Sequence, residues 1–486
     1  MIDKQSVNVD FSTGATVTSK AIQSAVSQAI EQAGGNLKEW QKKQYMHKEE
    51  KIKQLDTQVV VLGAGPSGMA TTLRLRQLGI NTVLVDKAKE VGGSFAFATN
   101  AYQYVSGTSL DPQSSLLPIN TLIDNLQKAG NGDRQMIQSF HHQLAETLRW
   151  QSEDLGITFQ KKYHYDEKDN TLLSVQYERK KEEFISLFRR EIGVSGATLL
   201  PQSAFCSYLK EGSKIVGVRV KKADGKLVDI RAKYVVLALG SQLSNNAGLT
   251  PVDTIKPYGG PKQDQGDGFL LAKQEGYTIS NLLSSDLYQA GANNGKEAVS
   301  VKEALMEMKV NTFAISDKHG NLFPVDNFKG DELDKWIKGL EYQRAYLWLS
   351  KTGYNKLRAS ILKTHSLSDK FIKEMNEKDS LVLAQGDSVS EVAKKAGIDL
   401  PNGIRLIGQL YCLKLEPYRI QTLAGLKTNI NYQLMIKDKA VDNVYAVGSV
   451  IGGIFGHHQP LGIANAFSFV SGKNVAEQIK HHLEAN

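Results

Sequence analysis

The sequence predicts an α/β fold built around a dinucleotide-binding βαβ unit, and three observations predict it. Four apolar residues, Val59–Leu62, run directly into the glycine-rich segment GAGPSG at 63–68. A segment with helical character, MATTLRLRQLG, follows this turn. A second apolar run, Thr82–Val85, then ends at an acidic residue, Asp86. Strand, glycine turn, helix, strand and acid in this order are typical of a Rossmann-like unit.

The residues of the turn suit the binding of a pyrophosphate. Gly63 permits the tight turn, Gly65 lets the backbone approach the phosphates, and Gly68 lets helix and strand pack closely. Pro66 and Ser67 belong to the same glycine-rich segment, and the N-terminal N–H groups of the helix that follows it face the phosphates. At the end of the second strand, Asp86 can accept hydrogen bonds from a ribose hydroxyl. An ordinary glycine turn in an α/β protein is the alternative.

Length and composition limit the class of protein. The 486 residues suffice for two or three domains. No apolar run approaches the roughly 18–20 residues of a membrane span. The N-terminus lacks the basic-then-apolar order of a signal peptide, so we expect a cytoplasmic protein without a membrane span.

Charge and cysteine content argue against two other classes. The net charge is +8, but lysines alternate with acids in KKQYMHKEEKIKQ, which favours a solvated helical face over a nucleic-acid surface. Cys206 and Cys412 lie far apart without metal-ligand spacing. We therefore expect no nucleic-acid partner, no disulfide framework and no metal.

Residues 1–35 form a separate segment. Apolar residues at helical spacing run from Ala21 to Ala33, and Gly34-Gly35 ends the helix, which Thr18 or Ser19 could cap. The preceding Asp10–Thr16, DFSTGAT, resembles the DxxTGAT sequence at which a flavin transferase joins FMN to a threonine. The resemblance implies covalent FMN on Thr16, although a Ser/Thr-rich capping loop is the alternative. Residues 36–55 are expected to be a connecting helix.

Further motifs follow the βαβ unit. Lys87 leads into Gly92-Gly93-Ser94, and this turn resembles the loop that wraps an FAD pyrophosphate in FAD-dependent reductases. Two alternating strands flank Asp224-Gly225, and a third strand, Tyr234–Leu239, meets Gly240. Gln265–Gly268, QGDG, resembles the TGDG of the same reductases. Residues 134–160 are expected to form an amphipathic helix and then a strand, with His141 and His142 on the helix surface rather than as ligands.

The C-terminal stretch returns to glycine-rich sequence. QTLAGLKTN at 421–429 precedes a strand, Asn443–Val447, and glycines follow from Gly448 to Gly456. The segment HHQPLGI at 457–463 then opens a closing helix. The N-terminal N–H groups of that helix would stabilise negative charge on a reduced flavin.

Together, residues 56–278 and 420–486 resemble the FAD-binding flavoprotein family of fumarate, urocanate and acrylate reductases, succinate dehydrogenases and 3-ketosteroid dehydrogenases. The resemblance implies a Rossmann-like FAD domain of the glutathione-reductase type, interrupted by an α+β cap over 279–419. It also implies hydride exchange between the flavin and a carbon–carbon bond. The implied FAD contacts are Gly63, Gly65, Pro66, Ser67, Gly68, Asp86, Lys87, Gly92, Gly93, Ser94, Ala238, Gly240, Asp267, Gly448, Ser449, Leu461, Gly462 and Ile463.

The dicarboxylate residues of the fumarate reductases are replaced. Gln421 stands at the position of their histidine and Pro460 at that of their arginine, and Asn321–Pro324 lacks a second arginine. Carboxylates are usually gripped by arginine forks, so these changes argue against fumarate or succinate. The match to 3-ketosteroid dehydrogenases is better, but Gln459 replaces their tyrosine. Ser449 replaces the glutamate that touches the ribityl chain in many reductases.

Several residues near the implied flavin are candidates for proton donation or substrate polarisation. They are Tyr418, Arg419, His457, His458 and Gln459. One of the two adjacent histidines must face away, and Arg419 and Tyr418 have structural alternatives as an ion pair and a core ring. Cap residues Lys329, Arg344 and Tyr346 cannot be placed from sequence.

We therefore predict a two-flavin ene-reductase. Covalent FMN would relay electrons to noncovalent FAD, which reduces the C=C of an enone or acrylate-like substrate other than fumarate. A flavin transferase would be needed for maturation, and an NAD(P)H-oxidising protein is a candidate electron donor. The alternatives are an FAD-dependent 3-ketosteroid-type dehydrogenase and a non-catalytic electron-transfer subunit.

Overall fold

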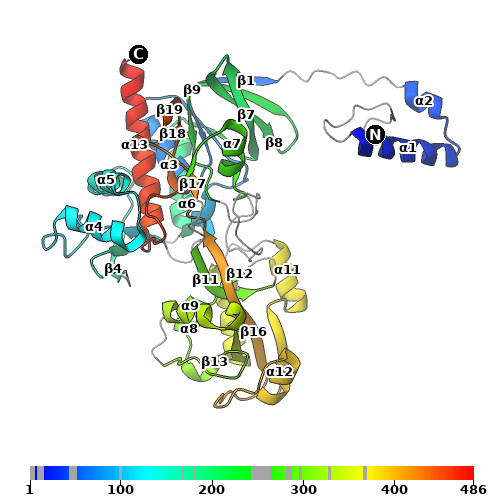
Figure 1. Ribbon diagram of the computed structural model, residues 1–486, viewed down its shortest axis with the longest axis vertical. Helices are drawn as coiled ribbons and strands as arrows, with labels where there is room; N and C mark the ends of the chain where they lie inside the picture. The colour runs from blue at the N-terminus through cyan, green and yellow to red at the C-terminus, as the bar shows by residue number, and fades with distance from the viewer. Residues whose placement is uncertain are drawn as a thin grey trace. The chain divides into compact units, whose positions relative to one another are not determined.

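Two units make up the chain, Met1–Lys53 and Gln54–Asn486, in the computed structural model (Figure 1). The structure describes residues 6–7, 16–42, 52–97, 101–166, 169–179, 181–241, 264–280, 287–294, 298–326, 330–364 and 369–485.

The first unit contains two helices, α1 (Thr16–Gln32) and α2 (Leu37–Lys42). Gly34 takes a φ of +76° after α1, where the sequence predicts the helix to end. The Ser6 hydroxyl donates to the Trp40 carbonyl over 3.0 Å, which ties the start of the unit to α2. The expected helix over 36–55 is helical at Leu37–Lys42, but Lys53 already begins a strand.

The glycine turn lies in an eight-stranded sheet of the second unit. Its main order is β18-β19-β9-β1-β2-β6, and β8 and β7 extend it from β9. β1 pairs with β2 in parallel, with Val59 opposite Thr82, as the βαβ pattern predicts. The strands are β1 (Lys53–Leu62), β2 (Thr82–Val85), β6 (Thr198–Leu200), β7 (Ser203–Glu211), β8 (Lys214–Lys222), β9 (Leu227–Leu237), β18 (Gln433–Ile436) and β19 (Lys439–Ala446).

One detail of this sheet differs from the prediction. The second strand of the Asp224-Gly225 hairpin and the apolar run that ends at Leu239 are one continuous strand, β9. Its first half pairs with β8, and its second half pairs with β19. A long strand can therefore carry both an alternating pattern and a fully apolar pattern, because its two halves have different neighbours.

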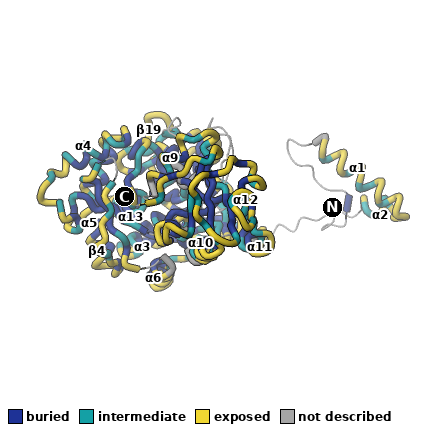
Figure 2. Tube along the Cα trace, turned by 90° about the horizontal axis from the view of Figure 1, so that it is seen from below, coloured by how far each residue is buried: buried dark blue, intermediate teal, exposed yellow. Residues whose placement is uncertain are grey.

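Two helices pack on the central strands and place the site. α3 (Pro66–Gln77) begins in the glycine turn, and α13 (Ile463–Ala485) runs beside it (Figure 1). A Cβ on Gly472 would lie 2.7 Å from the Ser67 carbonyl oxygen, so a glycine there allows the close approach of the two helices. The buried residues of β1, β9, β19 and both helices form one apolar core (Figure 2).

A helical and three-stranded layer covers α13. It consists of α4 (Ile119–Gly130), α5 (Arg134–Glu153), α6 (Lys181–Val194), β3 (Tyr102–Tyr104), β4 (Phe159–Tyr165) and β5 (Leu173–Tyr177). The expectation that His141 lies on the helix surface is wrong: His141 is 5% exposed, and burial lowers its pKa to about 4. Its ring lies on the apolar face of α5 against Tyr104 and Phe140, whereas His142 is exposed.

A second sheet is antiparallel in its described pairings. In the sequence, its strands lie between β9 and β18, two strands of the first sheet. β16 (Leu410–Gln421) is its central strand, and the others are β11 (Leu287–Asn293), β12 (Ala298–Ser300), β13 (Phe313–Ser316), β14 (Ala345–Ser350) and β15 (Val382–Gly386). Leu413 and Leu415 face one apolar core, and Cys412 faces another with Trp348. The helices are α8 (Lys302–Met306), α9 (Gly330–Gly339), α10 (Lys351–Thr364), α11 (Asp369–Lys378) and α12 (Val389–Ala396).

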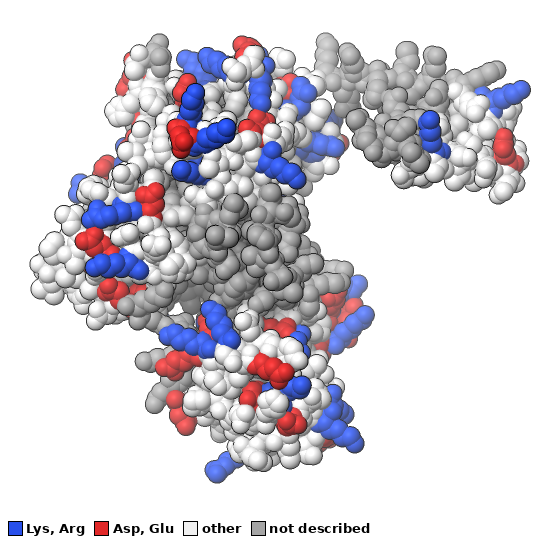
Figure 3. Space-filling view, in the orientation of Figure 1, with Lys and Arg blue, Asp and Glu red and all other residues white. Residues whose placement is uncertain are grey.

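Short elements connect the two sheets. β10 (Ile279–Ser280) pairs with β17 (Gly425–Leu426), and α7 (Asp267–Glu275) precedes β10. The 3-10 turns are η1 (Gly93–Phe97), η2 (Val310–Thr312), η3 (Glu341–Gln343) and η4 (Gly448–Val450). The described surface carries mixed charge, and Figure 3 shows Lys and Arg interspersed with Asp and Glu.

Candidate functional site

The glycine turn between β1 and α3 leaves no room for a side chain at Gly63 or Gly68. A Cβ on Gly63 would lie 2.1 Å from the Ala238 carbonyl oxygen, and one on Gly68 would lie 1.8 Å from the Gly63 carbonyl oxygen. Gly63 also has a φ of +109°, in the region that favours glycine. Gly65 precedes Pro66 at the start of α3, so the N–H groups of the first helical turn lie at the same place.

The loop after β2 lies directly on this turn. The Gly92 amide donates to the Ala64 carbonyl over 2.8 Å, and a Cβ on Gly93 would lie 2.9 Å from the Gly65 Cα. Ser94 follows with an exposed side chain. The glycine turn at 63–68 and the loop at Gly92-Gly93 thus form one surface that is lined by backbone, which suits a pyrophosphate.

Asp86 and Lys87 extend this surface from the end of β2. The Asp86 carboxylate accepts hydrogen bonds from the amides of Ala64 and Ala88, each over 2.6 Å. Burial raises the pKa of Asp86, although these two hydrogen bonds oppose the shift. Lys87 pairs with Asp267 over 2.6 Å, and Asp267 begins α7, where an acid is favourable.

One acidic residue at this site was missed by the sequence reasoning. Asp264 is 5% exposed and accepts hydrogen bonds from Ser94 over 3.4 Å and from Ser241 over 3.3 Å. A Cβ on Gly240 would lie 2.9 Å from its Oδ1. Asp264 stands three residues before Asp267, directly before the QGDG motif. The one sequence signal for a role in this site was an acidic residue next to that motif.

The loop before α13 closes the other end of the surface. Gly448 has a φ of +71°, and a Cβ there would lie 2.5 Å from the Ser67 hydroxyl oxygen. Its amide donates to the Ser471 hydroxyl over 3.1 Å. Gly462 has a φ of +78°, and its Cβ would lie 2.8 Å from the Tyr102 carbonyl carbon. These contacts place Ser449 and the Leu461–Ile463 turn near the starts of both helices.

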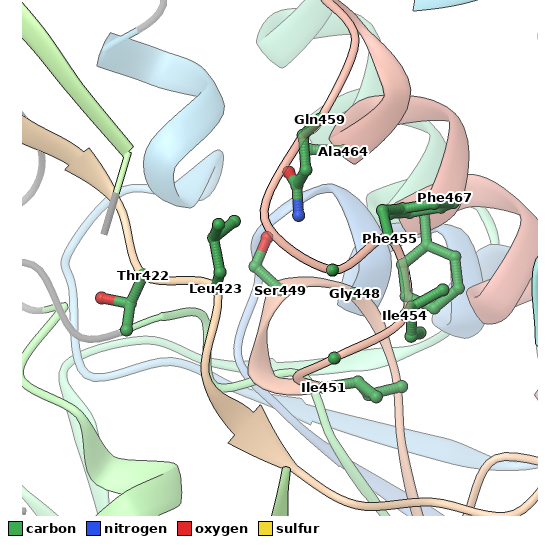
Figure 4. Close-up of a pocket in the computed structure, with 12 residues that line it drawn as sticks. Thr422, Leu423, Gly448, Ser449, Ile451, Ile454, Phe455, Gln459, Ala464 and Phe467 are labelled. Carbon is green, nitrogen blue, oxygen red and sulfur yellow. The ribbon is translucent and has the colours of Figure 1, made fainter. Parts of the chain in front are cut away.

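A pocket opens between this loop and the end of β16. Its lining residues are Thr422, Leu423, Gly448, Ser449, Ile451, Gly453, Ile454, Phe455, Gly456, Gln459, Ala464 and Phe467. Figure 4 shows Gln459 and Ser449 pointing into the same space, with Thr422 and Leu423 across from them. Gln459 Oε1 is buried and has no hydrogen-bond partner among the residues that the structure describes. None of these lining residues carries a formal charge.

The five predicted catalytic residues lie in different environments. His458 Nε2 lies 2.9 and 3.0 Å from the two carboxylate oxygens of Asp166, and His457 is exposed. Tyr418 is buried, and a Cβ on Gly291 would lie 2.5 Å from its ring. The side chain of Arg419 lies outside the described residues. Gln459 is the one member of the five among the residues that line the described pocket.

A family comparison identifies the cofactor of this site. The sequence model of a family described as "FAD binding domain" matches residues 58–464. The chain belongs to this family. It is an FAD-dependent oxidoreductase, and the glycine-lined cradle from Gly63 to Gly93 and the Asp86 carboxylate fit a dinucleotide.

Curated relatives share nearly the whole chain at low identity. A urocanate reductase of Eggerthella lenta is 22% identical over 98% of this chain and 84% of its own length. A probable fumarate reductase of Shewanella frigidimarina is 23% identical over 88% of this chain and 75% of its own length. An NADH:acrylate oxidoreductase of Vibrio harveyi is 21% identical over 98% of this chain and 56% of its own length.

Solved structures share the fold. The open conformation of a flavocytochrome c3 fumarate reductase matches with a TM-score of 0.69 and 21% identity, over 88% of this chain and 78% of the other. The 3-ketosteroid Δ1-dehydrogenase of Sterolibacterium denitrificans also gives 0.69, with 13% identity, over 88% of this chain and all of the other. The mixed α/β fold is therefore that of FAD-dependent flavoprotein dehydrogenases.

Neither a metal cluster nor a membrane-spanning helix is found among the residues that the structure describes. No group of three or more His, Cys, Asp or Glu side chains in the described part of the chain could hold a metal ion. No helix among these residues is both long and apolar enough to cross a membrane.

Proposed function

We propose that this protein is an ene-reductase that transfers a hydride to the C=C of an α,β-unsaturated substrate of the enone or acrylate type. FAD supplies the hydride chemistry when bound. The relatives named for urocanate, fumarate and acrylate support this reaction class, because each of these compounds carries a C=C conjugated to a carbonyl or carboxylate group. Residues 56–278 and 420–486 would hold the cofactor, and residues 279–419 would form the cap.

The uncharged pocket at the start of α13 carries the proposal. A dicarboxylate such as fumarate needs cationic partners, and the lining residues of this pocket offer hydroxyl, amide and backbone groups instead. Arg419 is the nearest arginine in sequence to the lining residue Thr422. This composition favours a neutral carbonyl or a single carboxylate.

Gln459 is the residue that we assign to polarise the substrate. Its side chain points into the pocket (Figure 4), and its buried Oε1 has no partner among the described residues, but the donor that this role needs would be the Nε2 amide group. The amide N–H groups can donate to a carbonyl oxygen on which negative charge develops as the hydride arrives. The N–H groups at the start of α13 favour negative charge at the same end of the pocket. Proton donation remains assigned to the group Tyr418, Arg419, His457 and His458.

The first unit supports a second part of the proposal, which concerns electron entry. Thr16 is the first residue of α1, and the other residues of the DxxTGAT motif lie outside the described residues. We infer that a flavin transferase attaches FMN to Thr16 and that this flavin passes electrons to FAD. A protein that oxidises NAD(P)H would supply them, and the relative named as an NADH:acrylate oxidoreductase is compatible with such a donor.

Two experiments test these two parts separately. Intact-protein mass spectrometry after co-expression with a flavin transferase should show the mass of FMN minus water, and Thr16→Ala should abolish this increment. Thr18→Ala, two residues along the same helix, is the matched control and should keep it. An increment that survives Thr16→Ala would refute the attachment site.

For the reaction, the anaerobically reduced protein is mixed with enones, cinnamates, acrylate and fumarate. Reoxidation of FAD faster than in buffer by at least one enone or monocarboxylate supports the proposal. The same uncharged pocket also suits a neutral ketosteroid, so the oxidised protein is tested with a saturated 3-ketosteroid and an artificial electron acceptor. Faster turnover in that direction, with Thr16 unmodified, would favour a 3-ketosteroid-type dehydrogenase instead.

A further inference from the structure

The buried acid Asp264 lies where three cofactor loops meet. Ser94 belongs to the loop after β2, Ser241 follows β9, and Asp264 itself precedes α7. Both serine hydroxyls donate to the same oxygen, Oδ2, while Oδ1 faces Gly240. A carboxyl group at this junction links the positions of all three loops, although no sequence motif includes it.

Gly240 shows how closely this carboxyl is packed. Its φ is +74°, and an added Cβ would lie 2.9 Å from Oδ1 and 3.4 Å from the carboxyl carbon. A side chain at residue 240 would therefore displace Asp264 as well as strain the backbone. The loop after β9 is shaped to accept this carboxyl.

We propose that Asp264 is a positioning residue for FAD, which it supports as a neutral carboxylic acid, already protonated near neutral pH and protonated on binding in more alkaline solution. The inference rests on FAD as the cofactor of this site and concerns how the chain retains it. The hydrogen bonds to Ser94 and Ser241 would hold the two loops at the separation that FAD requires. The proton comes from solvent, and no bond of the cofactor changes.

The charges around Asp264 support this state. Burial raises its pKa to about 8 and Asp267 acts in the same direction, whereas Lys87 and the hydrogen bonds from Ser241 and Ser94 oppose the shift. Lys87 is already paired with Asp267 over 2.6 Å, so it is shared between two acids. The FAD pyrophosphate would bring further negative charge to the same loops, and nearby anions favour the neutral form of a carboxyl group.

The expected pH dependence follows from this linkage. Below about pH 8, Asp264 is protonated before FAD binds, so affinity should not depend on its titration. Above that pH, the free protein has lost a proton that the complex requires. The apparent Kd for FAD should then rise with pH, by up to about tenfold per pH unit, until the pKa of the complex is reached.

The experiment measures FAD binding to the full chain between pH 6.5 and 9.5, by flavin fluorescence after removal of FAD from the holoenzyme. We expect a flat Kd up to about pH 7 and, at about pH 9, a Kd roughly tenfold above that plateau. Asp264→Asn keeps the size of the side chain but cannot ionise, so its profile should be flat throughout. Asp224→Asn, in the exposed β8–β9 turn, is the matched control and should follow the wild-type profile.

Calorimetry gives a second readout that does not depend on the variant folding. Binding of FAD at pH 9, in two buffers of different ionisation enthalpy, should show uptake of close to one proton per FAD, and at pH 6.5 close to none. Uptake that persists in Asp264→Asn would come from another group, such as the partly buried Asp86, and would overturn the assignment. A flat wild-type profile without proton uptake would overturn the proposal, whereas failure to bind FAD at any pH would instead refute the cofactor.

Discussion

The two ends of the proposed FAD site are built from different groups. The dinucleotide end, from Gly63 to Ser94, is lined by backbone and surrounded by charged side chains, and an added Cβ there would lie within 3 Å of other backbone atoms at Gly63, Gly68 and Gly93. The described residues that line the pocket at the start of α13 are uncharged, and among them is Gln459, whose buried oxygen has no partner in the described structure. The glycines of the first end permit almost no substitution. The side chains that line the second end can differ between family members that act on different substrates.

The largest expected effect lies at the dinucleotide end. Gly68→Val should abolish FAD binding, because a Cβ at this position would lie 1.8 Å from the Gly63 carbonyl oxygen and the turn must shift. The purified protein should be colourless and should melt at a lower temperature than the wild type. Flavin absorbance and circular dichroism check both outcomes.

A glycine outside the site provides the control. Gly193 lies in α6 with no atom within 4 Å of an added Cβ. Gly193→Ala should keep full FAD content and should stabilise the protein by up to about 1 kcal/mol through helix propensity. If Gly68→Val retained FAD as Gly193→Ala does, the close contact at the turn would not matter.

An intermediate effect is expected in the pocket. Gln459→Leu removes the proposed donor to the substrate oxygen, so kcat/KM should fall on the order of 100-fold while FAD content stays unchanged. Leu423→Met, a volume-conserving change in the lining of the same pocket, should cost much less. Equal losses in both variants would mean that packing matters and that the Gln459 amide does not.

The difference between the two ends also explains what could be predicted from sequence. The βαβ unit was predictable because its glycines are required by close backbone contacts that any dinucleotide fold must make. Asp264 was not, because its role depends on a contact with Ser94, 170 residues away in the chain. His141 shows the same limit, since a histidine on a helix faces the core only if a partner such as Tyr104 lies there.

The proposed catalytic group shows this limit most clearly. His457 and His458 are adjacent in a motif near the flavin, but the structure pairs His458 with Asp166 and leaves His457 exposed. Gln459 follows them in sequence and lines the pocket. Which of three consecutive side chains enters a pocket depends on the backbone path of an irregular loop, and no periodic pattern predicts it.

The smallest effect is expected at the Lys87–Asp267 ion pair. Both side chains are about a quarter exposed, so Lys87→Met should weaken FAD binding by only about 1 kcal/mol, or about fivefold in Kd. The loss should shrink in 0.5 M salt because screening already weakens the pair in the wild type. Fluorescence titration at two salt concentrations checks this, and a loss comparable to that of Gly68→Val would show that charge, rather than the glycine cradle, dominates the dinucleotide end.

Three substrates that share the fumarate C=C but differ in charge test most directly whether the substrate pocket is uncharged. Stopped-flow reoxidation of the prereduced, FAD-loaded protein is measured with dimethyl fumarate, monomethyl fumarate and fumarate, and each rate is divided by that of free reduced FAD to remove intrinsic reactivity. An uncharged pocket predicts that the normalised rate falls as charge is added, with the dianion slowest. Fumarate as the fastest of the three would contradict the account, since it would require a cationic grip on two carboxylates in the substrate pocket.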